Sequence, residues 1–511
     1  SSQMSGSQKV EIHSSFSRVM NGLIVYPGCN PLDLLDEYRI LNDGQRTAIR
    51  KMLLAEDYAL LLGLPGTGKS STTALFIRIL IARGQKVLLT SFTHSAVDNL
   101  LGKLVAAGLL SNHVARLGIA ENVHLNNQKY VFDNSQFTSI TSLQQRCQDI
   151  RLVACTALAA SKHPLISEFD LDYCVMDEAG QITQPAAVGA IILTKRFVLV
   201  GDDHQLPPLV ISKQAQQEGM DVSLFKRLID AHPSAIVCLT TQYRMNDDIM
   251  EVCNHLVYGN RMKCAGVHVA KQRLLLPRFS ELPLPHFIDH SSVSHLNTRT
   301  DWLYCTLIPA ASVVFLNTDN LPDDHLIHNL NSSSSSSSKT SNYKTASVSS
   351  ASEAKVVATI LWGLHLLGYK LAGSVGVITP YRAQVKLIQQ IIEWDKLNNA
   401  GGVEVSTVDK FQGRDMEIVI LSTVKVDMST SDSVESDDGV DRVGHLLRDW
   451  RRINVAITRA RVKLIIIGSL RVFNRVPVLE ALGHFVINRG WVVDLPFNST
   501  SIYRDFSQAL I

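Results

Sequence analysis

One short glycine-rich segment carries the residue types that bind nucleotide phosphates. Residues 63–70 read GLPGTGKS and match the pattern G-x-x-x-x-G-K-S/T. In this pattern backbone amides surround the phosphates, Lys69 reaches the β- and γ-phosphates, and the Ser70 hydroxyl can bind Mg²⁺. A buried strand precedes the segment and a helix begins inside it, so a chance glycine-rich turn is a poor explanation. The residues expected to contact the nucleotide here are Gly63, Pro65, Gly66, Thr67, Gly68, Lys69, Ser70 and Ser71.

An acidic pair and an amide provide the remaining chemistry of phosphate hydrolysis. The run CVMDEAGQ places Asp177 and Glu178 directly after an apolar strand. Asp177 can hold Mg²⁺ through water, and Glu178 can orient or deprotonate an attacking water. Gln205, in GDDHQLPPLV, follows another strand, where its amide could contact a γ-phosphate. The acidic pair is weak evidence alone and strong evidence beside the glycine-rich loop, so ATP or GTP hydrolysis is the working hypothesis.

The elements that must position these residues alternate between buried strands and helices. Residues 58–201 contain the runs YALLLG, KVLLTS, RLVACT, YCVMDE and RFVLVGD, which are apolar on both faces, as parallel strands are. A helix is expected from Lys69 to Arg83, where Gly84 can end it. This alternation predicts a doubly wound α/β domain.

A second series of the same kind follows. Its strand candidates are SVVFLN, SVGVITP, VEVSTV, EIVILST and VKLIIIGS, separated by helical patterns near residues 246–258, 352–368, 381–396 and 448–460. We therefore predict two similar α/β domains in tandem, with a boundary near residues 232–238. A serine-rich stretch (331–352) and an acidic stretch (427–441) are interpreted as solvated insertions rather than as phosphorylation or docking segments.

Composition limits the classes of protein that fit. The 511 residues carry a net charge of +2, so any nucleic-acid contact must come from a local groove rather than from a global basic field. The eight cysteines have no metal-ligand spacing, which predicts free thiols in a reducing compartment. No apolar run is long enough to span a bilayer and no signal peptide is evident, so we expect an intracellular protein without a membrane partner.

Six separated blocks, in this order, resemble the superfamily-one helicases of the 5′-to-3′ branch. They are GLPGTGKS, DEAGQ, GDDHQLPP, QYRMN (242–246), STVDKFQGRD (406–415) and RRINVAITRAR (451–461). The resemblance covers nearly all of residues 41 to 470 and implies two RecA-like domains with parallel doubly wound sheets, ATP between them and a nucleic-acid strand across both. We expect residues 1–40 to be a tail or the remnant of an upstream domain. The first RecA-like domain is expected at 41–235, and the second, with both insertions, at 236–511.

Within this branch the chain is similar to the helicase half of the eukaryotic DNA-replication helicase/nucleases that process Okazaki-fragment flaps and resected ends. The supporting segments include LLTSFTHSAVDNLL (88–101), SLFKRL (223–228) and LLRDWRRINVAITRA (446–460). Two alternatives stay open: an RNA helicase of the nonsense-mediated-decay type, and a nucleotide-gated binding scaffold with an idle motor. The scaffold predicts that catalytic residues are lost, whereas all of them are present.

The resemblance implies roles for individual residues. Gln45 would read adenine and Tyr243 would stack on it, while Arg244 and Arg459 would reach the γ-phosphate. Asp415 would contact the nucleotide where the family usually has Glu. On a helix, Arg452, Val455, Ala456 and Arg459 would share one stripe, with Arg452 as a supporting contact. The catalytic set implied is Lys69, Asp177, Glu178, Gln205, Arg244 and Arg459.

Contacts to the nucleic-acid strand are expected from hydroxyls, amides and cations at strand ends, which hold phosphates without reading sequence. His94 fits a strand contact and a satisfied loop histidine equally well, and Tyr381 fits base stacking and a structural role equally well. The expected contacts are Ser91, Thr93, His94, Thr156, Pro380, Tyr381, Arg382, Thr407 and Lys410.

The resemblance also predicts cofactors, partners and location. We expect ATP and Mg²⁺ as cofactors, single-stranded DNA or alternatively RNA as substrate, and replication or repair proteins such as a single-strand-binding protein as partners. The family's nuclease domain precedes the helicase and uses a four-cysteine iron–sulfur cluster. The residues before Gln45 contain one cysteine, Cys29, so we expect no such cluster and no nuclease activity, and either a fragment or a helicase-only form. The expected location is the nucleus, with the mitochondrion as a second compartment.

Overall fold

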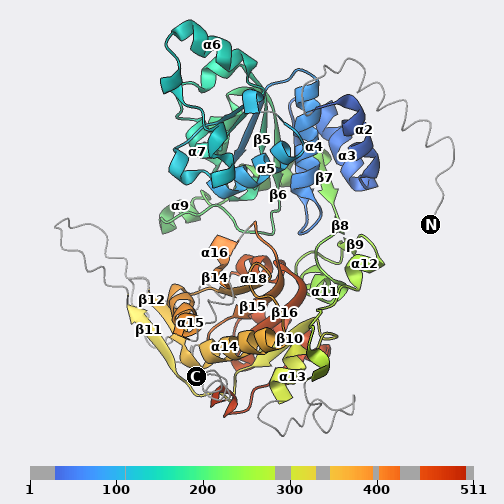
Figure 1. Cartoon of the computed structure of the whole chain (residues 1–511), viewed down its shortest axis with the longest axis vertical. Helices are drawn as coiled ribbons and strands as arrows, with labels where there is room; N and C mark the ends of the chain where they lie inside the picture. Colours follow the sequence, from blue (N-terminus) through green and yellow to red (C-terminus); the bar gives the residue numbers. More distant parts are fainter. Residues whose placement is uncertain are drawn as a thin grey trace, which may run out of the picture. The chain divides into compact units, whose positions relative to one another are not determined.

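The chain forms two compact units, Ser1–Thr241 and Gln242–Ile511. Figure 1 shows the computed structural model of the chain, in which each unit is a parallel sheet with helices around it. The residues that the structure describes are 29–109, 111–281, 301–329, 346–394, 402–411, 413–425 and 449–501.

The first unit is built on seven strands in the order β3-β4-β2-β5-β6-β1-β7. Every pairing in this sheet is parallel, as the apolar runs predict. The strands are β1 (Tyr58–Gly63), β2 (Val87–Ser91), β3 (Val114–Arg116), β4 (Leu152–Thr156), β5 (Leu171–Met176), β6 (Thr194–Gly201) and β7 (Ile236–Leu239).

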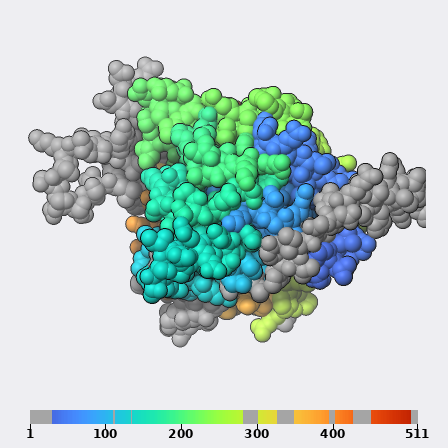
Figure 2. Space-filling model, turned by 90° about the horizontal axis from the view of Figure 1, so that it is seen from above, coloured from blue at the N-terminus to red at the C-terminus, as the bar shows by residue number. Residues whose placement is uncertain are grey.

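Both faces of this sheet are covered, because neighbouring residues of a strand point to opposite faces. Leu61 and Leu89 belong to one hydrophobic cluster, whereas Leu60 and Leu88 belong to another. The described α-helices of this unit are α2 (Pro31–Ile40), α3 (Asp43–Leu54), α4 (Lys69–Ala82), α5 (His94–Ala106), α6 (Ile140–Asp149), α7 (Ala157–Ala160), α8 (Gln184–Ile191), α9 (Lys213–Gln217) and α10 (Leu224–Ala231). In Figure 2 the blue, teal and green segments of this unit share one face, so parts far apart in the sequence lie side by side.

The second unit contains six parallel strands in the order β14-β13-β15-β16-β10-β17. These are β10 (Val313–Asn317), β13 (Val375–Thr379), β14 (Glu404–Thr407), β15 (Met416–Ser422), β16 (Ala460–Gly468) and β17 (Val492–Asp494). Two small sheets accompany it, β8 (Thr241–Gln242) with β9 (Lys263–Cys264), and β11 (His325–Asn329) with β12 (Ala346–Ser350). The helices are α11 (Asp247–Leu256), α12 (Val267–Ala270), α13 (Asp301–Leu307), α14 (Ala351–Leu366), α15 (Arg382–Trp394), α16 (Val408–Phe411), α18 (Trp450–Ile457), α19 (Leu470–Phe473) and α20 (Pro477–Asn488).

The expected α/β architecture of two tandem domains is confirmed, and three expected limits differ. The units divide after Thr241 rather than after residue 235, because β7 pairs with β1 and completes the first sheet. The end of the serine-rich stretch is not an insertion, because residues 346–350 form β12 against β11 and α14 begins at Ala351. Helix α18 ends at Ile457, three residues before the expected end at 460. Residues 331–345 and 427–441 lie outside the described residues.

Three further observations concern the thiols, the lengths of the apolar helices and the acidic, histidine and cysteine side chains. All eight cysteines are free thiols, and Cys29, Cys147, Cys155, Cys174 and Cys253 among them are buried. None of the described helices is both long and apolar enough to cross a membrane. In the described residues no group of three or more His, Cys, Asp or Glu side chains is placed to hold a metal ion.

Candidate active site

The glycine-rich loop joins β1 to α4 and has the backbone shape that phosphate binding requires. Gly66 and Gly68 have φ angles of 73° and 80°, in the left-handed region that glycine adopts without strain. The loop is closed on itself, because the Thr67 hydroxyl donates to the Leu64 carbonyl at 2.7 Å and its amide donates to the same oxygen at 3.3 Å. Helix α4 begins at Lys69, so its first amides open toward the loop.

Lys69 lies folded back along the loop. Its ammonium group donates to the carbonyl of Gly63, and a Cβ atom on Gly63 would overlap the Lys69 side chain. The glycine at position 63 is therefore needed for this path of the lysine, and not only for the turn. Phosphate oxygens would replace the Gly63 carbonyl as the acceptor for Lys69.

Gln45 is tied to the same loop from α3. Its amide nitrogen donates to the Thr67 carbonyl at 3.2 Å, and its amide oxygen accepts the backbone N–H of Asn42 at 3.2 Å. Asn42 in turn caps α3 by accepting from the Gln45 backbone at 2.9 Å. Gln45 is therefore placed beside the phosphate loop, and its reading of adenine stays a prediction.

The acidic pair follows β5, between β2 and β6 in the sheet, so it shares the carboxyl edge with the loop after β1. Asp177 is buried, its backbone amide donates to the Thr90 carbonyl at 2.8 Å, and its carboxylate accepts from the Glu178 amide at 3.0 Å. Burial and the neighbouring Glu178 charge raise the pKa of Asp177 to about 7, against the opposing effect of Lys69. Glu178 has a φ angle of 51°, a strained conformation for a residue with a side chain, which is typical of functional sites.

Gln205 follows β6 and is held by the residues before it. Its side-chain amide donates to the Asp202 carboxylate at 2.9 Å, and its backbone amide donates to the Asp202 carbonyl at 3.2 Å. The structure thus brings Lys69, Asp177 and Gln205 to one edge of one sheet. Ser70 and Asp177 supply hard oxygen donors of the kind that Mg²⁺ prefers. A magnesium ion bound by these two and by phosphate oxygens needs no larger cluster of acidic residues.

In the second unit, Arg244 and Asp415 come together although they are far apart in the chain. One guanidinium nitrogen of Arg244 donates to the Thr458 carbonyl at 3.1 Å, and another lies 3.8 Å from the Asp415 carboxylate. The other oxygen of Asp415 lies 3.9 Å from Nε of Arg461. Asp415 therefore lies between two arginines, an arrangement that the sequence did not indicate.

Arg459 is buried, with 3% of its surface exposed. Its Nε donates to the Val455 carbonyl at 3.0 Å, and its terminal nitrogens donate to the Arg414 carbonyl and the Thr458 hydroxyl, both at 3.3 Å. Because β15 and β16 are in register at Met416 and Ala460, Arg459 and Asp415 lie at the amino end of the same two strands.

The expected stripe of residues 452, 455, 456 and 459 is wrong, because α18 ends before residue 459. Val455 and Ala456 are core residues of the second unit. Arg452 forms ion pairs with Asp449 at 2.9 Å and with Asp409 at 3.3 Å. Arg452 therefore stabilises the start of α18 and is not a support for Arg459 on a shared helix face.

The turn that carries Tyr243 and Arg244 is fixed by Gln242, a fully buried amide that sequence reasoning did not single out. Its side-chain oxygen accepts from the backbone amides of Arg244 and Met245, both at 2.8 Å. Its side-chain nitrogen donates to the Met245 carbonyl at 2.7 Å. Tyr243 is 44% exposed and so presents a ring surface.

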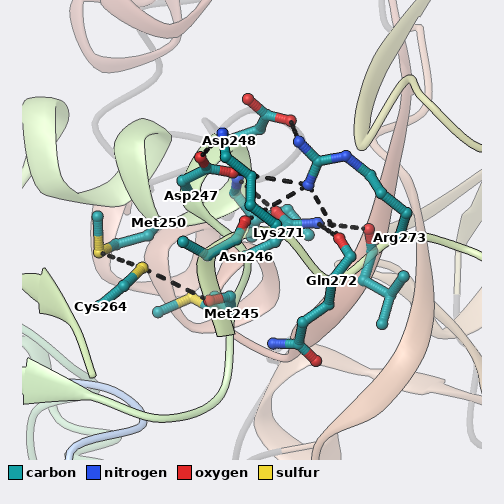
Figure 3. A network of polar contacts seen from close by, with 12 residues as sticks. Met245, Asn246, Asp247, Asp248, Met250, Cys264, Lys271, Gln272 and Arg273 are labelled. Atoms are coloured by element: carbon teal, nitrogen blue, oxygen red, sulfur yellow. Dashed lines mark hydrogen bonds and ion pairs between the residues drawn. The ribbon is translucent and has the colours of Figure 1, made fainter. Parts of the chain in front are cut away.

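Figure 3 shows the network that holds the chain directly after this turn. Asn246 caps α11 and donates to the carbonyls of Gln272 at 3.2 Å and Val462 at 2.8 Å. Asp247 pairs with Lys271 at 2.8 Å and with Arg273 at 3.6 Å. The position of Arg244 thus depends on residues 271–273, which no motif includes.

Of the expected strand contacts in the first unit, all four lie at the carboxyl edge of β2 and β4. Ser91 ends β2 and is in register with Thr156, which ends β4. Thr93 caps α5 by accepting from Ala96 at 3.2 Å, and His94 is the first residue of that helix. The Ser91 hydroxyl is buried and has no hydrogen-bond partner within the described part of the chain.

The expected contacts in the second unit lie after β13 and β14, whose last residues Thr379 and Thr407 are in register. Arg382 and Lys410 are exposed, and Pro380 is buried. Tyr381 is 2% exposed and packs against Val348 and Val424. Its ring face is covered, so the structure favours the structural role for Tyr381 over base stacking.

A buried carboxylate, Glu353, holds the end of β15 beside Tyr381 and was not expected from the sequence. It accepts hydrogen bonds from the Ser422 hydroxyl at 2.7 Å and from the backbone amides of Val424 at 3.0 Å and Lys425 at 2.7 Å. Val424 has a φ angle of 62°, a strained value that these bonds maintain. Burial raises the pKa of Glu353 to about 7, although the hydrogen bonds oppose that shift.

This pKa predicts a pH dependence of stability. Between the ordinary pKa of 4.5 and a folded-state pKa of about 7, the folded state binds more protons than the unfolded state. The free energy of unfolding should therefore fall by about 3 kcal/mol as the pH rises through this window. We expect the unfolding temperature of the wild-type protein to fall more steeply from pH 5 to pH 7.5 than that of Glu353→Gln. The exposed control Glu393→Gln should show the same pH dependence of the unfolding temperature as the wild type. The prediction is contradicted if the unfolding temperature of Glu353→Gln falls with pH as steeply as those of the wild type and this control.

Comparisons with known proteins agree with the geometry. Two family models, each described as an AAA domain, match residues 220–471 in one case and residues 40–151 and 139–213 in the other. The chain is 38% identical over 463 residues to the DNA replication ATP-dependent helicase/nuclease DNA2 of Bos taurus, covering 89% of this chain and 40% of that protein. The same-named proteins of Homo sapiens and Saccharomyces cerevisiae are each 38% identical, with 89% and 88% of this chain covered and 39% and 27% of theirs.

The chain therefore spans less than half the length of these relatives. Among solved structures, the crystal structure of Arterivirus nonstructural protein 10 (helicase) covers 91% of this chain and 65% of its own at 13% identity. The TM-score of this pair is 0.37.

The phosphate loop, the acidic pair and the two parallel sheets define a P-loop protein with tandem RecA-like domains. The two AAA-domain models match successive parts of the chain. Over 88–89% of its length the chain matches the helicase region of the DNA replication ATP-dependent helicase/nucleases at 38% identity. The expected similarity to the helicase half of these helicase/nucleases is thereby confirmed.

Proposed function

We propose that this chain is an ATP-driven helicase and translocase that moves 5′ to 3′ on single-stranded DNA during replication and repair. The observation that carries the proposal is the convergence of Lys69, Asp177 and Gln205 at one edge of the first sheet. These residues form a site for hydrolysis of a nucleoside triphosphate, and the relatives' names supply the DNA substrate.

In this mechanism Lys69 holds the β- and γ-phosphates and Glu178 orients the attacking water or accepts its proton. Mg²⁺, held by Ser70 and Asp177, would neutralise the charge that develops on the phosphates. Arg244 and Arg459 act on the γ-phosphate, and Gln45, Tyr243 and Asp415 hold the rest of the nucleotide. Loss of the γ-phosphate releases the arginines, so each cycle changes the grip on the strand.

The nucleic-acid strand would contact polar residues at the carboxyl edge of each sheet. In the first unit the proposed contacts are Ser91, Thr93, His94 and Thr156. In the second unit they are Arg382, Thr407 and Lys410. Hydroxyl and cationic groups fit phosphate contact, which does not depend on base sequence. Pro380, which is buried before α15, stays a proposed contact of the nucleic-acid strand. We propose nuclear location and contact with a single-strand-binding protein on the basis of the relatives' role in DNA replication.

The decisive experiment compares ATP hydrolysis with and without matched single-stranded DNA and RNA. We expect DNA to raise the turnover rate. The substitution Lys69→Ala should lower the turnover rate by at least about 100-fold, because the positive charge that contacts the phosphates is lost. The exposed Lys213→Ala, in the same unit, is the matched control and should keep the wild-type rate.

Each outcome of this comparison has a clear meaning. Stimulation by RNA alone would replace the DNA helicase by an RNA helicase, and no stimulation by either nucleic acid would contradict the motor. Duplexes with a single 5′ or 3′ tail then test the direction of movement. The prediction that this chain has no nuclease activity is tested by incubating the same DNA with Mg²⁺ and following its length.

A further inference from the structure

A buried ion pair orients the side chain of His94. Arg116, at the end of β3, is fully buried, and its Nε donates to the Asp98 carboxylate of α5 at 2.8 Å. A terminal nitrogen of Arg116 donates to the Leu117 carbonyl at 2.8 Å, and the other lies 3.1 Å from Nδ1 of His94. The guanidinium is thus held on three sides, and one of its contacts is the histidine ring.

This contact determines the protonation state of the ring. A guanidinium only donates hydrogen bonds, so Nδ1 of His94 must accept. The ring is therefore neutral and carries its proton on Nε2. Partial burial and the charge of Arg116 lower the pKa of His94, and Asp98 opposes them only in part.

Asp98 also accepts hydrogen bonds from two other residues. The second oxygen of its carboxylate accepts from the backbone amide of His124 at 2.9 Å, and its carbonyl accepts from the Asn127 side chain at 2.9 Å. The charged groups that act on His94 are thus Asp98 on its own helix and Arg116 on β3. Because every member of this network is hydrogen-bonded, the network is rigid.

The ring lies where a strand contact was expected. His94 follows the end of β2, beside Ser91 and Thr156 at the carboxyl edge of the sheet. Gly118 passes the ring with a φ angle of 143°, and a side chain there would place its Cβ 3.7 Å from Cε1 of His94. The φ angle favours glycine at this position, and the neighbouring ring of His94 is partly exposed. In the described residues no group forms a hydrogen bond with Nε2.

We propose that His94 binds the phosphodiester backbone of the nucleic-acid strand by donating its Nε2 hydrogen as a neutral imidazole, and that Arg116 and Asp98 are positioning residues that select this tautomer. The inference rests on the proposed function and deepens it by naming the atom and its charge state. A neutral donor holds a phosphate oxygen without adding a cation, so it should leave the salt dependence of binding unchanged. Its contribution should not increase from pH 8 to pH 6, whereas that of an imidazolium would increase.

Two amide substitutions separate this role from a structural one. The amide nitrogen of glutamine reaches the position of Nε2, whereas that of asparagine reaches only Nδ1. With a labelled oligothymidylate and a non-hydrolysed ATP analogue on the full chain, we expect His94→Asn to bind about tenfold more weakly. His94→Gln should stay within about threefold of the wild type, and the exposed His484→Asn should match the wild type. Equal affinities of the two His94 variants would overturn the proposal.

The positioning role is tested by a double-mutant cycle. We expect Arg116→Lys, which cannot hold Asp98 and His94 together, to weaken binding about as much as His94→Asn does. It should add nothing further in the His94→Asn background, because both changes remove the same contact. Full additivity would overturn the positioning role.

The tautomer can be observed without any binding assay. In protein labelled with ¹⁵N at histidine, the resonance that disappears in His94→Gln should have the two-bond couplings of a neutral ring protonated at Nε2 at pH 7. A proton on Nδ1, or an imidazolium, would overturn the inference whatever the binding results. If the wild-type chain binds neither DNA nor RNA, the proposed function fails together with this inference. If it binds and His94→Asn binds equally well, only the inference fails.

Discussion

Replacing Arg459 by alanine should lower the rate of ATP hydrolysis about a thousandfold or more while changing the affinity for ATP only severalfold. An arginine that stabilises the charge of the phosphoryl-transfer transition state contributes three to five orders of magnitude in other enzymes of this chemistry. In this chain the guanidinium is buried and held by the Val455 carbonyl, the Arg414 carbonyl and the Thr458 hydroxyl. Such a preorganised cation costs little reorganisation at the moment of reaction.

The measurement is steady-state hydrolysis beside equilibrium binding of a fluorescent ATP analogue. Arg471→Ala is the matched control, because that arginine is 73% exposed in the same unit. Removing a buried guanidinium also leaves carbonyl oxygens unpaired, so thermal unfolding must show that the variant remains folded. Arg459→Lys keeps the charge without the planar group and should recover only part of the rate. A folded Arg459→Ala protein that hydrolyses ATP at the wild-type rate would refute the role of this arginine.

Glu178→Gln should lower the turnover rate by about 10²- to 10⁴-fold, the usual contribution of a general base, with ATP binding retained. The substitution keeps the shape of the side chain and the strained backbone at φ 51°, so it removes the charge and little else. Glutamine can still donate to or accept from Gln181, whose amide lies 3.3 Å from the Glu178 carboxylate.

A single-turnover assay separates this loss of chemistry from slow product release. Glu121→Gln, at an exposed position of the same unit, should behave as the wild type. Unchanged turnover in Glu178→Gln would assign the base to another group or to the phosphate itself. Loss of ATP binding would instead show that Glu178 supports the shape of the site.

The local parts of this protein could be read directly from its sequence. The segment from β1 through GLPGTGKS to α4 is contiguous, and its glycines, lysine and serine carry both the backbone shape and the chemistry. Most strands of the two sheets were recognisable, because strands covered on two faces are apolar throughout, whereas β3, β7 and β17 were not predicted. The parallel sheets and the placement of Asp177 and Gln205 at one edge follow from these two facts.

Features that depend on pairing between distant segments could not be read in this way. The four residues of β7 belong to the first sheet only because β1 offers them a partner. Residues 346–350 look like a polar linker in the sequence, and they form a strand because β11 lies beside them. Tyr381 is buried by Val348 and Val424, neither of which adjoins it in the chain.

The same distinction separates the reactive groups from the groups that hold them. Lys69, Asp177 and Arg459 were predicted from motifs, because their chemistry requires a residue type at a fixed spacing from its neighbours. The partners that orient such residues, Gln242 for Arg244 and Arg116 for His94, have no characteristic spacing, because a hydrogen bond only requires two atoms to meet in space. Sequence therefore named the chemistry of this protein, and its folding decided which atoms are held in place to perform it.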